Sequence, residues 1–252
     1  MINLAWRAAS LAVLAAFVAL WGEVAALKLI SPVFLPTPAR AWTALWHGFE
    51  KADLGVKFMG TIEHMLGGWV IASIAGIGLG ALIGSSRRAR EYVGPTLEFL
   101  RPLPASAVIP VAIAIFGFTP SMALGVIGFG AIWPMLLATL HGFAAVEPRL
   151  GEVARALGLS RWQAALKISL PSAAPDILAG LRLGLTVSLI LAVVCEMIAG
   201  LDGLGQWELL AARSYKSADI FAGVILLGAI GVTANGLLSL VESRALRWRA
   251  RE

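Results

Sequence analysis

The residue best placed to do chemistry in an apolar part of the chain is Glu196, within the run ILAVVCEMIAG. An ionisable group in a membrane span usually faces a cavity or a partner side chain, and it is a functional-site hypothesis by default. Glu196 therefore either lines a polar pathway or is held near the outer interface by a structural partner, and both interpretations stay open. Because a carboxylate repels anions, we do not expect Glu196 to bind an anionic substrate directly.

Three further residues are candidates for the same pathway. Ser188 lies two steps before Glu196 on a ridge of small residues that are spaced four apart. Pro104 and Pro110 interrupt the apolar segment RPLPASAVIPVAIAIFG, and proline frees backbone carbonyls and kinks helices. A kinked helix can line a pathway, act as a hinge or simply suit the packing.

Motifs for catalysis are absent from the sequence. There is no G-x(4)-G-K-[ST] nucleotide-binding loop, no H-E-x-x-H, no paired-cysteine motif and no G-x-S-x-G. The three histidines, His47, His64 and His141, are scattered, and His64 is interpreted as one half of an interfacial pair with Glu63. The sequence therefore predicts no enzyme, no metal site and no cofactor on this chain.

The segment 147–184 is the longest polar-containing stretch between two strongly apolar ones. Leu150, Val153 and Leu157 fall on one stripe of a short helix, and Gly158 after them is a natural helix stop. This pattern predicts the first half of a helical hairpin.

A second helix is expected to start at once. Ser160 and Gln163 have the spacing of a capping box, Trp162 follows on the new helix, and Pro171 ends it. The loop 147–171 is thus predicted to hold two short amphipathic helices joined by a tight turn. Periodicity alone cannot decide whether they rest on the membrane surface or dock into a groove of another protein.

Five residues of this hairpin follow the pattern E-x-A-x(3)-G-x(11)-L-P, namely Glu152, Ala154, Gly158, Leu170 and Pro171. The pattern resembles the EAA loop in the membrane subunits of binding-protein-dependent ABC importers. The usual Glu-Ala-Ala start is Glu-Val-Ala here. The stretch RPLPASAVIPVAIAIFG also resembles the nitrate, sulfonate and taurine branch of that family.

The resemblance implies the type I importer membrane fold, an all-α polytopic protein with six transmembrane helices and a cytoplasmic coupling hairpin. It also implies a permease homodimer, two cytoplasmic ATPase subunits that bind ATP and Mg, and an external binding protein. That protein would deliver a small polar solute such as nitrate, a sulfonate or taurine. The residues implied in coupling to the ATPase are Glu152, Ala154, Leu157, Gly158, Ser160, Trp162, Leu170 and Pro171. In this scheme Glu152 meets the motor, Gly158 sets the hairpin angle and Pro171 fixes the exit toward the next span.

Composition agrees with a membrane protein. The 252 residues are 59% hydrophobic and only 14% charged, whereas soluble domains average about 25% charged residues. The net charge of +5 could suggest a nucleic-acid partner in a soluble protein. The placement of the charges matters more here, and we expect no nucleic acid.

Six apolar segments are each long enough to cross about 30 Å of hydrocarbon. They cover residues 8–30, 59–84, 94–117, 121–143, 176–199 and 219–241. We interpret residues 1–252 as a single transmembrane permease domain in the bacterial inner or plasma membrane. The first segment is expected to be a retained span, because no clear cleavage site follows it.

The distribution of Lys and Arg predicts the orientation. With the N-terminus inside, the inner segments carry fourteen of them and the outer segments six. The inner ones are Arg7, Arg87, Arg88, Arg90, Arg101, Arg149, Arg155, Arg161, Lys167, Arg182, Arg244, Arg247, Arg249 and Arg251. Both termini and the hairpin are therefore expected in the cytoplasm.

Two other classes of membrane protein are alternatives to the importer. A secondary transporter that works without an ATPase usually carries more spans, internal repeats and midplane ionisable groups. A membrane-embedded enzyme needs a cluster of polar groups at one depth, which this sequence does not offer. Dependence of uptake on ATP rather than on an ion gradient separates the importer from the secondary transporter.

Overall fold

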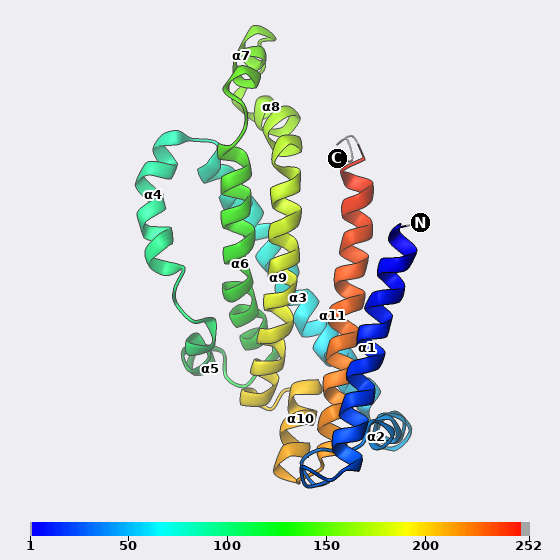
Figure 1. Ribbon diagram of the computed structural model, residues 1–252. Coiled ribbons are helices and arrows are strands. Elements are labelled where there is room, and N and C mark those ends of the chain that lie inside the picture. Colours follow the sequence, from blue (N-terminus) through cyan, green and yellow to red (C-terminus); the bar gives the residue numbers. More distant parts are fainter. Residues whose placement is uncertain (1, 248–252) are drawn as a thin grey trace. The chain divides into compact units, whose positions relative to one another are not determined.

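The computed structural model describes residues 2–247, and every regular element in that range is a helix (Figure 1). Arg249 and Arg251 of the predicted basic tail lie outside the described residues. The helices are, in order, α1 (Ile2–Ala26), α2 (Pro38–Lys51), α3 (Leu54–Gly84), α4 (Arg87–Leu100), η1 (Ala105–Val108), α5 (Ile109–Phe116), α6 (Pro120–Ala144), α7 (Pro148–Ala156), α8 (Arg161–Ala164), η2 (Ala165–Ser169), α9 (Leu170–Ala199), α10 (Leu204–Arg213) and α11 (Ser217–Ala245).

The chain divides into two compact units. Unit 1 holds the residues up to Gly60 together with Asp202–Ala229, and therefore α1, α2, α10 and the first parts of α3 and α11. Unit 2 holds Thr61–Leu201 and the chain from Ile230 onward. Helices α3 and α11 thus each contribute to both units.

Within residues 2–247, five helices are long and apolar enough to cross a membrane, and a bent pair would make a sixth. Four of the predicted spans match α1, α3, α6 and α11 to within a few residues at most ends. A fifth, 176–199, is only the later part of a helix that runs without a break from Trp162 to Ala199.

The segment predicted as the third span, 94–117, is the bent pair. Its helical parts are Arg87–Leu100 and Ala105–Phe116, which meet at an angle of 78°. The bend falls at Arg101-Pro102-Leu103-Pro104, because prolines there cannot donate backbone hydrogen bonds and Pro104 is extended, with φ −68° and ψ 120°. Pro110 lies in the first turn of α5, where proline is tolerated and causes no kink.

Proline and threonine also start two of the other helices. Thr37 and Thr119 are the N-cap residues of α2 and α6, and each side chain accepts a hydrogen bond from a backbone N–H in the first turn. Each is followed by a proline at the first helical position. Helix α10 was not predicted, since it lies between the fifth and sixth predicted spans.

The core of unit 2 is built on small residues of α3 and α9 that pack against α6. On α3, glycines at positions 68, 76, 80 and 84 and Ala72 contact α6, and Ala72 clusters with Ala131 and Met135. On α9, Gly180 and Gly184 lie against Pro134, Met135 and Ala131. In lipid, small residues let helix backbones approach closely, so the i+4 ridges are packing surfaces.

This close approach predicts a clear effect for Gly80→Ala. The added Cβ would lie 2.6 Å from the carbonyl oxygen of Leu136, and a backbone atom cannot move aside. We expect a destabilisation of about 1–3 kcal/mol, seen as a lower melting temperature in detergent. Gly78→Ala is the control, because its Cβ meets no atom within 4 Å. Equal melting temperatures for the two variants would contradict this account of the α3–α6 contact.

Candidate functional site: the α7–α8 hairpin and the Glu196 cluster

The turn between α7 and α8 has the geometry that the sequence predicts. Gly158 adopts the left-handed conformation, with φ +65°. The N–H of Leu159 donates to the oxygen of Ala154 (2.9 Å), and the N–H of Gly158 donates to the oxygen of Arg155 (3.0 Å). These are the two bonds of a Schellman motif, so α7 ends at a fixed point.

The capping box that starts α8 is also present. The Gln163 side chain accepts from the Ser160 N–H (2.9 Å), and the Gln163 N–H donates to the Ser160 hydroxyl (3.2 Å). Both ends of the turn are therefore held by hydrogen bonds, and the angle between α7 and α8 is set locally.

The second hairpin helix was expected to end at Pro171, and this prediction is wrong. Helix α8 passes through the π-helical segment η2 directly into α9. In η2 the Leu170 N–H donates to the oxygen of Ala165, five residues back. The wider turn accommodates Pro171, which has no N–H of its own, so the helix continues instead of stopping.

The hairpin exposes its apolar side chains. Leu157 is 68% exposed, and Leu150 and Val153 belong to the same partly exposed stripe; Trp162 of α8 is 67% exposed. Ala154 is buried, whereas Glu152 is exposed and lies about 140° around α7 from Leu157 at 100° per residue. Leu170 is half-buried and Pro171 is exposed. An apolar stripe of this kind is typical of a protein-binding surface.

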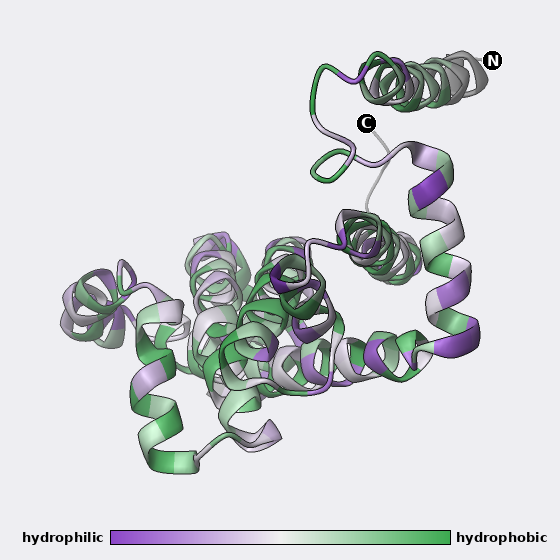
Figure 2. Ribbon diagram, turned by 90° about the horizontal axis from the view of Figure 1, so that it is seen from below, coloured by the Kyte–Doolittle hydropathy of each residue, from purple (hydrophilic) through white to green (hydrophobic). Residues whose placement is uncertain are grey.

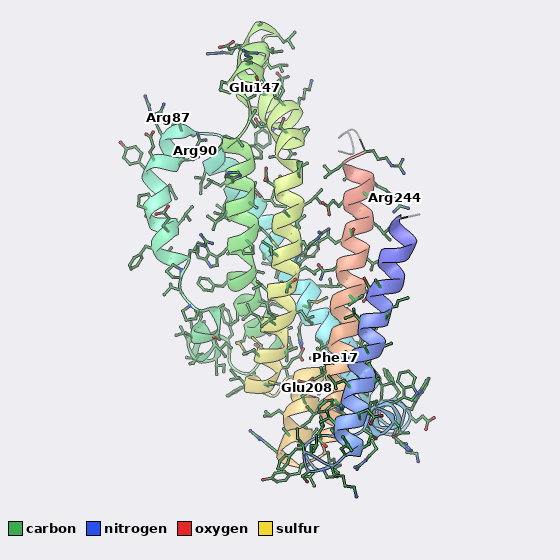
Figure 3. The ribbon with its side chains drawn as sticks, viewed as in Figure 1. Phe17, Arg87, Arg90, Glu147, Glu208 and Arg244 are labelled. Atoms are coloured by element: carbon green, nitrogen blue, oxygen red, sulfur yellow. The ribbon has the colours of Figure 1, made fainter. Side chains whose placement is uncertain are left out.

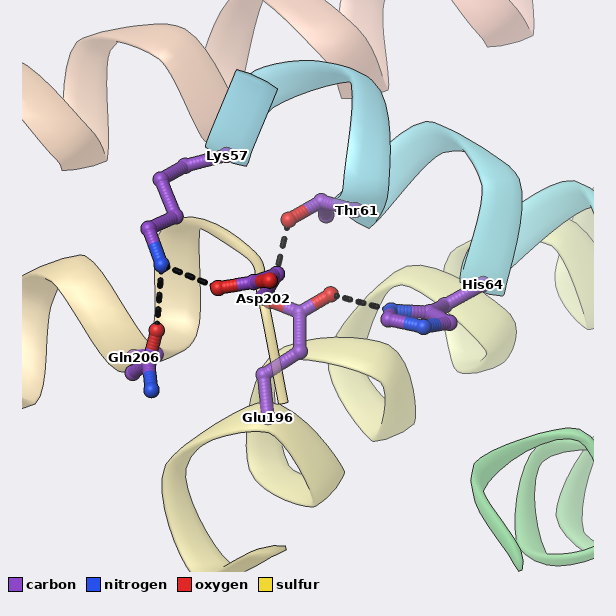
Figure 4. Close-up of polar contacts among 6 residues, drawn as sticks. All are labelled: Lys57, Thr61, His64, Glu196, Asp202 and Gln206. Atoms are coloured by element: carbon purple, nitrogen blue, oxygen red, sulfur yellow. Dashed lines mark hydrogen bonds and ion pairs between the residues drawn. The ribbon is translucent and has the colours of Figure 1, made fainter. Parts of the chain in front are cut away.

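A second group of polar side chains is buried in unit 2 and centred on Glu196 of α9 (Figure 4). Its carboxylate is fully buried. It accepts a hydrogen bond from the Thr61 hydroxyl (2.9 Å) and lies 3.0 Å from the Nδ1 atom of His64. Because Thr61 and His64 are on α3, the cluster links α3 to α9.

Unit 1 contains a separate polar group, also drawn in Figure 4. The Lys57 ammonium donates to the side chains of Asp202 and Gln206. Lys57 is in the first part of α3, and the other two residues precede and begin α10. The contact holds the start of α10 against α3.

Basic residues gather toward one end of unit 2. Figure 3 shows Arg87, Arg90 and Arg244 toward the end that also carries Glu147 and the hairpin. Arg182 of α9 forms an ion pair with Glu242 of α11 in the same unit. The side chains of Arg7 and Arg161, which were counted in the predicted charge bias, lie outside the described residues.

Comparison with known proteins identifies the family of proteins to which the chain belongs. Residues 72–247 match the family described as binding-protein-dependent transport system inner membrane component. The chain belongs to this family. It is thus a membrane-spanning permease subunit of an ABC importer, a transport protein and not an enzyme.

Relatives of the permease cover almost its full length. It is 31% identical to the putative aliphatic sulfonates transport permease of Bacillus subtilis, over 93% of this chain and 85% of that protein. It is 32% identical to a nitrate import permease of Leptolyngbya laminosa (89% and 81% covered). It is 30% identical to the taurine transport permease of Escherichia coli (95% and 89% covered). The nitrate, sulfonate and taurine branch is thus confirmed.

The fold of the permease is that of type I importers. The MetNI methionine ABC transporter, in an inward-facing form, has a chain that superposes with a TM-score of 0.66 at 20% identity. The match covers 79% of the permease and 96% of that chain. An amino acid ABC transporter gives a TM-score of 0.58 at 21% identity.

The four pathway candidates of the permease lie in different surroundings. Glu196 and Ser188 are both fully buried, and the Ser188 hydroxyl donates to the oxygen of Gly184 (2.8 Å). Pro104 and Pro110 are exposed. The structure brings Glu196 together with Thr61 and His64 and not with the two prolines, so the structural-partner interpretation of Glu196 describes its contacts in this chain.

Sequence reasoning missed the roles of Thr61 and His64 in the permease. A usable signal was present, because His64 lies one step of four residues before Gly68 on the ridge of α3. Glu196 likewise lies one step beyond Ala192 on the ridge of α9. Extending each packing ridge by one step of four residues reaches His64 on α3 and Glu196 on α9, the two residues that contact each other.

Proposed function

We propose that this permease forms the translocation pathway of an ATP-driven importer and couples to its motor through the α7–α8 hairpin. The coupling residues are Glu152, Ala154, Leu157, Gly158, Ser160, Trp162, Leu170 and Pro171. Residues 1–252 act as one permease domain, with both termini and the hairpin in the cytoplasm. The basic residues at the hairpin end of unit 2 support this orientation.

The observation that carries the coupling proposal is the hairpin itself. It combines a turn fixed by four hydrogen bonds, exposed apolar side chains and an unbroken helix from Trp162 to Ala199. At 1.5 Å per residue this helix is about 57 Å long. A push on the hairpin therefore moves α9 as a whole.

The proposed partners follow from the family. Two permease copies form the pathway, two cytoplasmic ATPase subunits bind ATP and Mg and close together, and an external protein delivers the substrate. ATP and the loaded binding protein each bias one state of the pathway through their differential affinity for it. The names of the relatives support a small polar solute, such as nitrate, a sulfonate or taurine, as substrate.

The test is purification of the permease from its native membrane in mild detergent, followed by mass spectrometry. We expect an equimolar soluble subunit that carries a nucleotide-binding loop. Leu157→Asp should lose this subunit, because it puts a charge in the apolar stripe. Gly151→Ala should keep it, because its Cβ would meet no atom within 4 Å.

Recovery of the permease alone would overturn the proposal if the protein then transports in vesicles with an ion gradient and no ATP. That result favours a secondary transporter. Retention of the ATPase by the Leu157→Asp variant would instead mean that the ATPase does not dock on the apolar stripe.

A further inference from the structure

Helix α2 lies crosswise at the end of a membrane-spanning helix. Figure 1 shows α1 lengthwise and α2 end-on, and Figure 2, turned by 90°, shows α2 lengthwise and α1 close to end-on. Both belong to unit 1. Because α1 runs across the bilayer, a helix crosswise to it at its end runs along the membrane surface.

The loop between α1 and α2 is fastened to its surroundings. The Trp21 Nε1–H donates to the oxygen of Pro36 (2.9 Å), and the Trp21 ring stacks on Phe221 of α11 with centroids 5.1 Å apart. At the other end of α2, Gly48 lies against Leu54 of α3. Helix α2 is thus held at both ends and keeps its crosswise direction.

Helix α2 has three distinct faces. Ala41, Leu45 and Gly48 are buried against the protein. The large rings of Trp42, Trp46 and Phe49 form a second face about 100° further around, at 100° per residue. The remaining arc is mostly polar and holds Arg40, Thr43, His47, Glu50 and Lys51.

The aromatic face is open. Trp42, Trp46 and Phe49 are 55%, 54% and 42% exposed, and the two indole rings contact each other edge to face, 6.0 Å apart. Tryptophan is enriched at the headgroup level of membranes, where an apolar body and a polar N–H are both satisfied. A helix with one aromatic face and one charged face is typical of an interfacial helix.

We propose that α2 is an interfacial helix, with Trp42, Trp46 and Phe49 seated among phospholipids at the boundary of headgroups and acyl chains. Helix α1, which precedes α2, also exposes large apolar side chains, including Leu14, Phe17 and Leu20, and these meet lipid in a spanning helix. The occupant is lipid because the bilayer already covers α1, from which α2 follows after one short loop. Its assignment to the outer leaflet rests on the proposed orientation of the chain.

A cavity beside α2 fits the same placement. It measures about 360 Å³ and lies between α2, α10 and the start of α11. The α2 residues that line the cavity, including His47 and Lys51, lie on the side away from the aromatic rings, and Lys216 also lines it. With the rings in lipid, this charged cavity faces water.

The experiment is a nitroxide scan of the full-length chain in vesicles of phosphatidylcholine and phosphatidylglycerol. The buried Cys195 is first changed to Ala, and single cysteines are placed at positions 42, 46 and 49 and at 43, 47 and 50. We expect collisions with oxygen to exceed collisions with a water-soluble nickel complex severalfold at the first set, and the reverse at the second. Phe49→Cys and Glu50→Cys are the matched pair, since both keep the two tryptophans.

Two outcomes overturn the proposal. Equal access of the nickel complex to both sets would mean that the aromatic face is hydrated. Low access of both reagents to the aromatic set would mean that a protein covers it. The scan needs neither ATPase nor substrate, so its failure is distinct from a failure of the importer assignment.

Discussion

Gly158→Arg is expected to abolish ATP-driven uptake while the permease still inserts into the membrane. Gly158 has φ +65°, and a residue with a side chain is strained in that region by about 1–2 kcal/mol. The added Cβ itself meets no atom within 4 Å, so the strain is in the backbone. Relief of that strain breaks the Schellman bonds and changes the angle between α7 and α8. Uptake, ATP hydrolysis and membrane content should be measured together. We expect uptake to fall at least tenfold, which corresponds to about 1.4 kcal/mol, while ATP hydrolysis and membrane content stay unchanged.

Gly158→Asn is the matched control for this result. Asparagine tolerates the left-handed conformation better than other residues with a side chain. It should therefore keep most of the uptake that Gly158→Arg loses. Normal uptake by Gly158→Arg would refute the coupling role of the turn, and equal loss in both variants would point to lost surface complementarity instead of turn geometry.

Glu196→Leu is expected to destabilise the permease strongly. The change removes the acceptor of the Thr61 hydroxyl and of His64 in a fully buried site. Leaving buried polar groups without a partner costs about 1–3 kcal/mol. We expect less protein in the membrane and a lower melting temperature, with Glu196→Gln intermediate because the amide keeps one acceptor oxygen.

A double-mutant cycle separates a contact from two independent effects. If His64 and Glu196 act together, His64→Leu combined with Glu196→Leu should cost less than the sum of the single changes, by about 0.5–3 kcal/mol. Full additivity would argue against the pair. A Glu196→Gln protein with normal melting but altered uptake would restore the hypothesis that this carboxylate acts in the pathway.

Most of the helices could be predicted because their signals are local. Apolar length marks the spans, and Gly158 with Ser160 marks the hairpin turn. The bend at Pro102 and Pro104 is local too, but it was assigned to the inside of a single span. Apolar composition does not show where a helix changes direction.

The parts that could not be predicted depend on contacts or on unusual hydrogen bonding. Pro171 favours a helix end because proline has no N–H to donate to the α-helical hydrogen-bond ladder. The π-helical turn that accommodates it depends on a five-residue hydrogen bond that apolar spacing and capping residues do not indicate. Helix α10 is short and only moderately apolar, so it resembled a turn. Predicting the partners of Glu196 requires knowledge of which faces of α3 and α9 meet. Residue spacing suggests these faces, but only the packing of the two helices determines them.

The exposed stripe of Leu150, Val153 and Leu157, together with the exposed Trp162, also bears on how the cell treats an unassembled copy of this subunit. On the proposed orientation, a permease synthesised in excess of its ATPase would display these side chains to cytoplasmic chaperones and proteases. Such machinery recognises apolar surface and removes what stays uncovered. The surface that is proposed to transmit force in the assembled importer would then act as a degradation signal in the orphan subunit, and would keep the numbers of the two subunits matched.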